Sequence, residues 1–334
     1  MKAAFCNQWG QPEVISFGTA QEPKPGRNDV LIAPAAWGVN FADLVQISGT
    51  YHLKPPFPFI PGMEVAGRVI AIGDGVERLR IGDRVASYVE SGGYAERVVA
   101  MAAATMTLPC SMPFEQGAAF SVAYVTAHIA LRHRANLQPG GTLLILGAAG
   151  GVGLAAVELG RALEATVIAG VSTDAKAHIA QQHGAHHTVN YLSGSLREEV
   201  MDLTKGRGVD VVLDPVGGDV FDAGLKCLAF EGCAIVIGFA SGRIPIVSAG
   251  RLLVKGTGIM GSSLTFTLKH RSEILPATYQ ELCNWYSQGK LRPHVSQILP
   301  FSSLRQGLRM LANREVTGKI VLIADPVTAR PVTN

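Results

Sequence analysis

One stretch of the sequence, residues 142–160, places a buried strand, a glycine turn and the start of a helix in immediate succession. The apolar run at 142–146 is typical of a parallel strand that is covered on both faces. The glycines between 147 and 153 let backbone N–H groups approach a phosphate, because no Cβ atom stands in the way. The helix that follows directs its positive end at that phosphate. This order of elements predicts an α/β fold that binds a dinucleotide, and a tight turn without a ligand is the alternative.

The end of the next strand pattern, residues 165–172, discriminates between the two nicotinamide cofactors. A site that prefers NAD has an acidic residue there, which accepts a hydrogen bond from the ribose 2′-hydroxyl. This sequence instead has Ser172, with Lys176 one helical turn later. A hydroxyl and an ammonium suit a 2′-phosphate, so the pattern favours NADPH. The alternative is that Lys176 is an ordinary solvated lysine, partly neutralised by Asp174.

Length and composition set the scale of the protein. Its 334 residues are too many for one small core and suit two domains. Hydrophobic residues make up 48% and charged residues 16%, as in a compact globular protein. The formal charge is only +3, without a cluster of Lys and Arg, so neither nucleic acid nor a membrane surface is expected as a partner.

The cysteines bear on the compartment. All five are scattered, and none forms a close pair of the kind that binds a metal. Reduced thiols in an intracellular protein are therefore expected. The first residues also lack the ordered basic, apolar and cleavage regions of a signal peptide. Both observations predict a cytoplasmic location.

The strand and helix patterns change in kind near residue 115. Before it we expect short strands separated by Gly and Pro turns, at 30–33, 65–72, 84–88 and 94–99. After it, strands and helices alternate, as in a doubly wound parallel sheet. We expect helices there at 114–135 and 174–183, and buried strands at 142–146, 165–172, 209–214 and 233–238. Beyond residue 265, helices at 272–287 and 303–312 precede a last strand at 318–323, and the chain is expected to return to its first domain.

Eight short motifs are spread over the whole chain. They are Gly38-Val-Asn-Phe-Ala-Asp-Leu44, Pro61-Gly-Met-Glu-Val-Ala-Gly67, Gly82-Asp-Arg-Val85, Gly92-Gly-Tyr-Ala-Glu96, Ala148-Ala-Gly-Gly-Val-Gly153, Asp214-Pro-Val-Gly-Gly218, Ile237-Gly-Phe-Ala240 and Gly318-Lys-Ile-Val321. Together they resemble the medium-chain dehydrogenase/reductase superfamily, and within it the zinc-free NADPH:quinone oxidoreductase branch, also called zeta-crystallin-like.

This resemblance implies a particular α/β architecture. A Rossmann doubly wound parallel sheet is inserted in a β-rich, chaperonin-10-like (GroES-like) catalytic domain. Residues 1–121 and 265–334 are then expected to form the GroES-like domain, and residues 122–264 the Rossmann NADPH-binding domain. The resemblance also implies a homodimer joined edge to edge through the Rossmann sheets, and the strand-like segment 256–261 is compatible with such an edge.

The alcohol dehydrogenases of the same superfamily hold a catalytic zinc through a Cys, a His and a further Cys or Asp. At these positions the chain has Asn40, Met63 and a segment without a thiol, residues 121–126. Zinc requires nitrogen and sulfur donors in a tetrahedral set, and Asn40, Met63 and Ala123 do not supply one. We therefore expect no metal. The histidine trio within 183–187 is interpreted as a solvated helix end, and a metal site there is the alternative.

Hydride can reach a quinone, or the β-carbon of an enone, without zinc if hydrogen-bond donors stabilise the charge on the acceptor oxygen. By family position the catalytic candidates are Asn40, which would orient the nicotinamide or the acceptor carbonyl, and Tyr51, whose phenol would donate to the developing oxyanion. Thr126 would face the nicotinamide ring, and Asp43 would orient a donor or relay protons. Alternatively, Asn40 is a turn residue, Tyr51 a packing residue and Asp43 a helix cap.

The resemblance also implies where NADPH binds. Ala149, Gly150, Gly151, Val152 and Gly153 would hold the pyrophosphate; Ser172, Lys176 and Tyr191 the 2′-phosphate; Gly238, Phe239, Ala240, Ser263 and Leu264 the nicotinamide half, together with Asn40 and Thr126.

One departure from the family pattern bears on the substrate. Related quinone reductases often carry a second Tyr near Asn40, and this chain has Val45 there, which makes the acceptor site less polar. The leading hypothesis is an NADPH-dependent quinone reductase acting on a small-molecule quinone. The alternatives are an NADPH-dependent reductase of enones or enals, which saturates the carbon–carbon double bond, and an NADPH-binding protein without a catalytic role.

Overall fold

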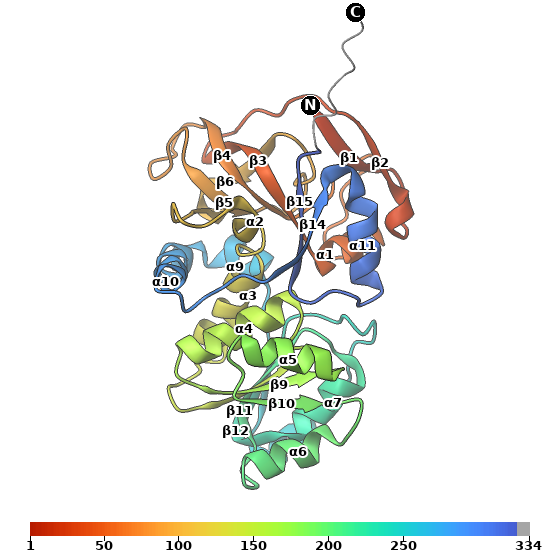
Figure 1. Ribbon diagram of the computed structural model, residues 1–334, viewed down its shortest axis with the longest axis vertical. Coiled ribbons are helices and arrows are strands. Elements are labelled where there is room, and N and C mark those ends of the chain that lie inside the picture. The colour runs from red at the N-terminus through yellow and green to blue at the C-terminus, as the bar shows by residue number, and fades with distance from the viewer. Residues whose placement is uncertain (326–334) are drawn as a thin grey trace, which may run out of the picture. The chain divides into compact units, whose positions relative to one another are not determined.

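The computed structural model describes residues 1–325, and the chain divides into two compact units (Figure 1). The first unit contains Met1–Ala119 and the C-terminal part that begins at Val295. The second unit contains Phe120–His294. The chain therefore passes from one unit to the other twice.

The first unit consists mainly of strands. Its elements are β1 (Lys2–Cys6), η1 (Pro12–Val14), β2 (Ile15–Thr19), β3 (Asp29–Val39), α1 (Phe41–Ile47), β4 (Glu64–Ile72), β5 (Arg84–Tyr88), β6 (Val98–Met101), η2 (Ala102–Ala104), β7 (Thr105–Thr107), α2 (Phe114–Gly117), β14 (Val295–Pro300), η5 (Phe301–Ser303), α11 (Leu304–Ala312) and β15 (Lys319–Ile323). β1 and β2 form a two-stranded ribbon. The larger sheet has the order β14-β15-β3-β4-β5-β7, and β6 also pairs with β3.

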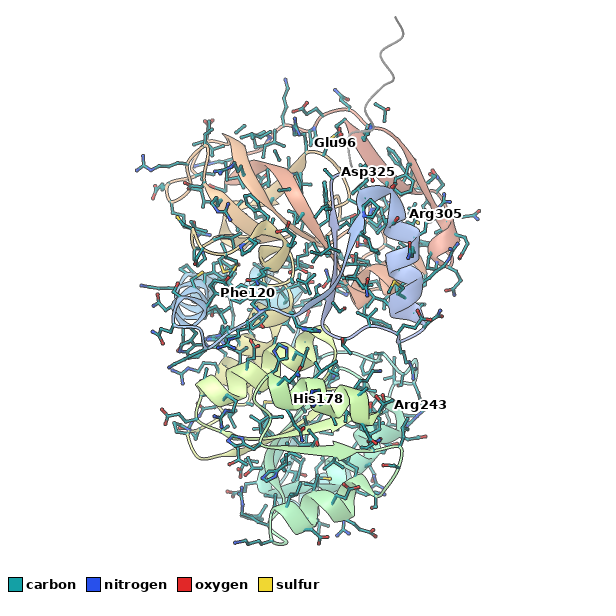
Figure 2. The ribbon with its side chains drawn as sticks, viewed as in Figure 1. Glu96, Phe120, His178, Arg243, Arg305 and Asp325 are labelled. Atoms are coloured by element: carbon teal, nitrogen blue, oxygen red, sulfur yellow. The ribbon has the colours of Figure 1, made fainter. Side chains whose placement is uncertain are left out.

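Both ends of the chain contribute to this first unit. The last strand, β15, pairs antiparallel with β3, with Ile320 opposite Val39, so the blue strand of Figure 1 lies beside a red-orange one. On α11, Arg305 (labelled in Figure 2) donates from Nε to the backbone oxygen of Ile15 at 2.7 Å. Apolar residues of both ends share one buried core, among them Leu322. The predicted return of the chain to its first domain is visible in these contacts.

The second unit alternates strands and helices. Its elements are α3 (Ala123–His128), η3 (Ile129–Arg134), β8 (Thr142–Leu146), α4 (Gly151–Ala162), β9 (Thr166–Val171), α5 (Asp174–Gln182), β10 (His187–Asn190), α6 (Leu196–Leu203), β11 (Val209–Asp214), α7 (Gly218–Lys226), β12 (Leu228–Val236), α8 (Ala249–Lys255), β13 (Gly258–Gly261), α9 (Leu264–His270), η4 (Ser272–Ile274) and α10 (Leu275–Ser287). The six strands are all parallel and have the order β10-β9-β8-β11-β12-β13.

This strand order defines the fold class. The order runs one way from β8 to β10 and the other way from β11 to β13, as in a doubly wound Rossmann sheet. Every residue of β8 is buried, which agrees with its unbroken apolar sequence. Figure 1 shows α4 and α5 on one side of the strands, and α6 packs against α7 on the other. The predicted combination of a β-rich unit and a Rossmann unit is confirmed. Ligands of such sheets bind where the order reverses, beyond the carboxyl ends of the strands.

Two local expectations differ from the structure. The helix expected at 114–135 is divided into α2 and α3, and α3 continues into η3, a π-helical turn. The strand expected at 94–99 begins only at Val98, as β6, and before it Ala95 forms a single bridge with Ala3. The reason is that the backbone of Tyr94 bonds elsewhere: its N–H donates to Pro61 at 2.9 Å and its oxygen accepts from Ala4 at 2.9 Å.

Residues 265–294 group with the second unit, whereas the sequence analysis assigned them to the first. The physical reason is that α10 packs on α3. His128 of α3 and Glu281 of α10 form a hydrogen bond of 2.7 Å, and the rings of Phe120 and Tyr286 lie edge to face at 6.1 Å. Residues 326–334 of the expected first domain lie outside the described residues. Within residues 1–325 no helix is both long enough and apolar enough to cross a membrane.

Candidate cofactor and active site

The glycine turn after β8 adopts the geometry of an anion site. Gly147 has a positive φ of 63°, and Gly150 precedes α4 in an extended conformation. The N–H groups of Gly151, Val152 and Gly153 occupy the first turn of this helix, where no intrahelical acceptor exists. Together with the helix dipole, these groups fit a pyrophosphate.

Two glycines of this turn have different roles. A Cβ on Gly153 would collide with the backbone of Gly147 and Ala148, so a glycine is required for the helix to pack against the turn. A Cβ on Gly150 would meet only the Gly147 oxygen, at 3.5 Å, which is an ordinary contact. The fold therefore has room for a Cβ at Gly150, and a glycine there leaves the backbone open to an approaching phosphate. The predicted Ala149 is buried in the same turn.

The three residues predicted for the 2′-phosphate lie at the neighbouring ends of β9 and β10. Lys176 Nζ donates to Ser172 Oγ at 3.4 Å. The backbone N–H of Tyr191 donates to Val171 at 3.0 Å, which holds Tyr191 beside the end of β9. Asp174, the residue expected to compete for Lys176, accepts a hydrogen bond from Asn190 Nδ2 at 3.0 Å. A hydroxyl, an ammonium and an aromatic ring thus meet at one strand end.

The loop that follows β12 contains Gly238, Phe239 and Ala240. The N–H of Ala240 donates to the Pro215 oxygen at 3.1 Å, which fastens this loop to the turn after β11. Asp214 closes that turn, because its Oδ1 accepts from the backbone N–H of Val216 at 2.8 Å and Gly217 at 2.9 Å. Burial raises the pKa of Asp214 to about 6, and these backbone donors oppose the shift.

A cavity of about 470 Å³ lies beside this loop. Its lining includes Phe239 and Ser263, two of the residues predicted for the nicotinamide half. Leu264 is the first residue of α9 and is buried. The cavity wall also contains Arg134 and Arg271, which the sequence analysis did not select. Arg134 is fixed by donation from Nε to the Gly261 oxygen at 3.1 Å. An isolated arginine at a helix end carries no sequence signal, so only the structure identifies it.

In the first unit, Asn40 lies in a buried polar cluster with Glu64 and Lys319. Lys319 Nζ donates to Asn40 Oδ1 at 2.5 Å and to Glu64 Oε2 at 2.7 Å. Asn40 Nδ2 donates to the same Glu64 oxygen at 3.1 Å. Glu64 is completely buried, Lys319 is 5% exposed and Asn40 is 9% exposed. A complete ion pair therefore lies directly against the amide of Asn40.

Asp43 stabilises the same turn from the other side. Its Oδ2 accepts from the backbone N–H of Asn40 at 2.8 Å, at the start of α1, and from the phenol of Tyr94 at 2.6 Å. Burial raises the pKa of Asp43 to about 6, against the lowering effect of the Tyr94 hydrogen bond. Within residues 1–325 its other oxygen, Oδ1, has no hydrogen-bond partner. Burial of the phenol also raises the pKa of Tyr94 well above its usual value.

The remaining catalytic candidates lie in separate places. Tyr51 is half-buried and its ring lies 4.1 Å from the ring of His52, while its N–H donates to the Val45 oxygen at 3.1 Å. Thr126 is buried on α3 of the second unit. Asn40 and Asp43 come together in the structure, and Tyr51 follows the same helix, α1.

A zinc ion does not fit the cluster around Asn40. The amide oxygen of Asn40 already accepts from the Lys319 ammonium, so a metal ligated by that oxygen would face a positive charge at close range. Met63 is buried and offers only a thioether. In the part of the chain that the structure describes, no three His, Cys, Asp or Glu side chains are grouped to hold a metal ion.

The sequence analysis named the motifs of three further cluster residues without assigning them a role. Glu64, Tyr94 and Lys319 each belong to one of the eight motifs. Lys319 stands 279 residues from Asn40, and a lysine before a strand is ordinarily a solvated residue. The one sequence signal for a role was that each of these three polar residues stands beside an apolar segment that is expected to be buried.

Comparison with known proteins gives a consistent result over the whole chain. Residues 26–110 match the family model described as "Alcohol dehydrogenase GroES-like domain", and residues 151–286 match "Zinc-binding dehydrogenase". A quinone oxidoreductase-like protein 2 homolog of Nematostella vectensis is 38% identical over 323 residues, which cover 96% of this chain and 88% of that protein.

Two bacterial proteins are similar over nearly their entire length. A quinone oxidoreductase of Pseudomonas aeruginosa is 35% identical over 316 residues, covering 94% of this chain and 97% of that protein. The crystal structure of the Escherichia coli quinone oxidoreductase complexed with NADPH superposes with a TM-score of 0.91 at 31% identity, covering 97% of this chain and 100% of that one.

Proposed function

Because the chain belongs to the medium-chain dehydrogenase/reductase superfamily, in its quinone oxidoreductase-like branch, we propose that it is an NADPH-dependent quinone reductase that works without zinc. The observation that carries this proposal is the environment of Asn40. A neutral amide, engaged by Lys319, stands where the zinc enzymes of the superfamily have a metal ligand. Charge that develops on the acceptor oxygen is then stabilised by hydrogen bonds.

The cofactor assignment rests on the second unit. When bound, NADPH supplies the hydride. The N–H groups of the first turn of α4 receive the pyrophosphate, and Ser172 with Lys176 receives the 2′-phosphate. A structural relative crystallised with NADPH supports this choice. Phe239 and Ser263 line the cavity that we assign to the nicotinamide half. The hydrogen bond from the N–H of Ala240 to the Pro215 oxygen holds the loop beside it in place.

On the acceptor side we assign donation to the developing oxyanion to Asn40 and Tyr51. Asp43 holds the backbone of Asn40 in place by its 2.8 Å hydrogen bond and does not itself contact the acceptor. Thr126 would face the nicotinamide ring of the bound cofactor. The bound NADPH would supply the hydride and solvent the proton, which together convert the quinone to the hydroquinone.

Val45 favours a second candidate function. It is half-buried, and its backbone oxygen accepts from the backbone N–H of Tyr51 at 3.1 Å, which ties an aliphatic residue to the backbone of the predicted donor. A less polar acceptor site suits an enone or enal, in which a hydride would be added to the β-carbon and a proton from solvent to the α-carbon, with negative charge on the carbonyl oxygen in between. The same donors serve both reactions.

Assembly and compartment are part of the proposal. β13 ends the sheet order, and the chain segment that precedes it carries exposed apolar side chains: Ile246 is 93%, Leu253 84% and Val254 82% exposed. A homodimer that joins two such edges would cover them. The five cysteines are free thiols, which supports a reducing compartment, the cytoplasm.

The test compares acceptors and variants. NADPH oxidation is followed with para-benzoquinone, with an α,β-unsaturated ketone and with an enal, in the presence and absence of a chelator. We expect quinone reduction that the chelator does not change and that Asn40→Ala lowers by about a hundredfold in kcat. Asn7→Ala, at an exposed position, is the matched control. Faster reduction of the enone would favour the second candidate, and tight NADPH binding without turnover would identify a binding protein and overturn the proposal.

A further inference from the structure

The ion pair between Lys319 and Glu64 is unusual for its depth. Glu64 is completely buried and Lys319 nearly so, in the sheet core of the first unit. Removing two charges from water costs several kcal/mol each, and a well-packed apolar pair is often as stable as a buried salt bridge. Stability alone therefore gives no reason for a charged pair at this point. The two groups share one neighbour, Asn40, and their effect on it accounts for their position.

The ion pair allows only one orientation of the Asn40 amide. The amide oxygen accepts from the Lys319 ammonium at 2.5 Å, and the amide nitrogen donates to Glu64 Oε2 at 3.1 Å. Turning the amide over would place its NH₂ group against an ammonium and its oxygen against a carboxylate. Both contacts would be repulsive, since an ammonium has no acceptor and a carboxylate no donor. The charges on either side thus fix which end of Asn40 is the donor.

The second N–H of Asn40 makes only a long hydrogen bond, which an acceptor at a shorter distance would replace. Apart from the Glu64 bond, Nδ2 reaches the Gly38 oxygen only at 3.4 Å, which is long for a hydrogen bond. The ammonium on the amide oxygen also draws electron density from the nitrogen, and this makes the remaining N–H a stronger donor. Gly38 permits the arrangement, because a Cβ there would collide with Glu64 Oε2 and the Ala118 oxygen.

We infer that Lys319 and Glu64 are positioning residues, which hold the Asn40 amide as a polarised donor toward the oxygen of the hydride acceptor. This inference rests on the proposed function, in which Asn40 contacts the acceptor. It adds two residues from distant parts of the chain to the machinery. The pair acts through Asn40 alone, and this is the property that an experiment can isolate.

The kinetic test is a double-mutant cycle. Removing one charge would leave the other buried and unpaired, so the two are exchanged together, as Lys319→Met with Glu64→Gln. The amide oxygen introduced by Glu64→Gln keeps an acceptor for Asn40 Nδ2. We expect this pair of substitutions to lower kcat about tenfold with little change in the KM for NADPH. Made in the Asn40→Ala background, the same pair should lower kcat no further. An equal loss in both backgrounds would overturn the inference.

A second readout needs no turnover. With ¹⁵N-labelled asparagine, the side-chain amide resonance of Asn40 is identified by its loss in Asn40→Ala. We expect it to move in the Lys319→Met, Glu64→Gln protein, while the resonance of exposed Asn7 stays in place. Lys255→Met, which removes a half-buried lysine of the second unit, is the matched control and should leave the Asn40 resonance unchanged.

The two readouts separate the inference from the proposed function. If the wild type reduces none of the acceptors, the proposed function fails, and the amide resonance alone decides whether Lys319 and Glu64 set the state of Asn40. An Asn40 resonance that does not respond to loss of the ion pair would overturn the inference whatever the activity. Circular dichroism of each variant verifies that the fold is kept.

Discussion

The phenol of Tyr94 donates to Asp43 Oδ2 across 2.6 Å, at a place where neither side chain is exposed to solvent. Asp43 in turn accepts from the backbone of Asn40. A buried carboxyl is thus the link between a tyrosine of the segment that joins β5 to β6 and the turn that presents the candidate catalytic amide. The pKa of Asp43 differs between the folded and unfolded protein because folding buries the carboxyl.

Asp43 should make the protein less stable as the pH rises. Burial raises its pKa from 3.8 to about 6, so between these values the folded state binds the proton more tightly than the unfolded state. The stabilisation is complete below the lower value and is lost as the pH rises through the higher one. Asp43→Asn removes this titration. From about pH 4 to pH 7 its unfolding free energy should gain roughly 3 kcal/mol relative to wild type.

Denaturant titrations at several pH values measure this difference. Asp214 has a pKa raised in the same direction, but it is present in both proteins and cancels. Tyr94→Phe serves as the second variant. It removes a donor that lowers the pKa of Asp43, so the loss of stability should extend to higher pH. Parallel curves for wild type and Asp43→Asn would contradict the prediction.

Lys176→Ala should weaken the binding of NADPH without weakening the binding of NADH. The ammonium lies 3.4 Å from Ser172 Oγ, and a charge-assisted bond to a phosphate contributes about 1.5–3 kcal/mol. The dissociation constant for NADPH should therefore rise by about tenfold or more, measured by fluorescence titration. Lys226→Ala, at the exposed end of α7, is the control and should change neither constant. Equal losses for the two cofactors would refute the 2′-phosphate assignment.

Alanine at two neighbouring glycines should have opposite effects. Gly150→Ala makes only an ordinary contact at 3.5 Å, so thermal unfolding should stay near that of wild type while NADPH binding weakens at least tenfold. Gly153→Ala collides with backbone and should cost about 1–3 kcal/mol of stability. Calorimetry of both variants, with and without NADPH, tells the effects apart. Normal NADPH binding by Gly150→Ala would place the pyrophosphate elsewhere.

Glu158 should be important for the stability of the second unit. This buried carboxylate of α4 accepts from Tyr124 at 2.6 Å and from the backbone N–H of Arg292 at 2.8 Å, and it bonds His183 Nδ1 at 2.6 Å. These three groups bond to both carboxylate oxygens of Glu158, whereas a Gln side chain has only one oxygen. Glu158→Gln should lower the unfolding free energy by about 1–3 kcal/mol, measured in urea. Asp202→Asn, exposed on α6, is the control and should cost little. A cost no larger than that of the control would be evidence against this assignment.

Charge on α8 should dissociate the proposed dimer. Leu253 and Val254 are the exposed apolar pair of this helix, and Asp at both positions would place two charges in an edge-to-edge interface. Sedimentation should show the wild type as a dimer and the double variant as a monomer. Ile81→Asp, at an exposed apolar position of the first unit, should leave the dimer intact. A wild type that sediments as a monomer rules the interface out.

Local patterns made the Rossmann unit predictable. β8 is a nearly unbroken apolar run, and the glycines that follow it mark the turn into α4. Ser172 and Lys176 were predicted from the end of one strand pattern and Tyr191 from the family resemblance, and the parallel pairing of β9 with β10 brings the ends of both strands side by side. In a unit where strands and helices alternate, consecutive strands are usually neighbours in the sheet, so residues at their ends are expected to lie close together.

The polar cluster of the first unit was predictable only in part. Asn40 and Asp43 are three residues apart, and helix geometry relates them directly. Glu64 and Lys319 reach Asn40 through strand pairing, which depends on the register of β15 against β3 and of β3 against β4. No local pattern encodes that register. The assignment of residues 265–294 differed for the same reason, since α10 packs on α3 across a long stretch of sequence.

The bond between Asn40 and Lys319 spans 279 residues, and β15 is the last strand of the described chain. During synthesis the first unit therefore waits for β15, while every element of the Rossmann unit has already been made. A chain still attached to the ribosome would be able to bind a nucleotide before its acceptor site exists. Catalytic competence would thus begin only once β15 has been added, and a message truncated before this strand would yield a nucleotide binder without turnover.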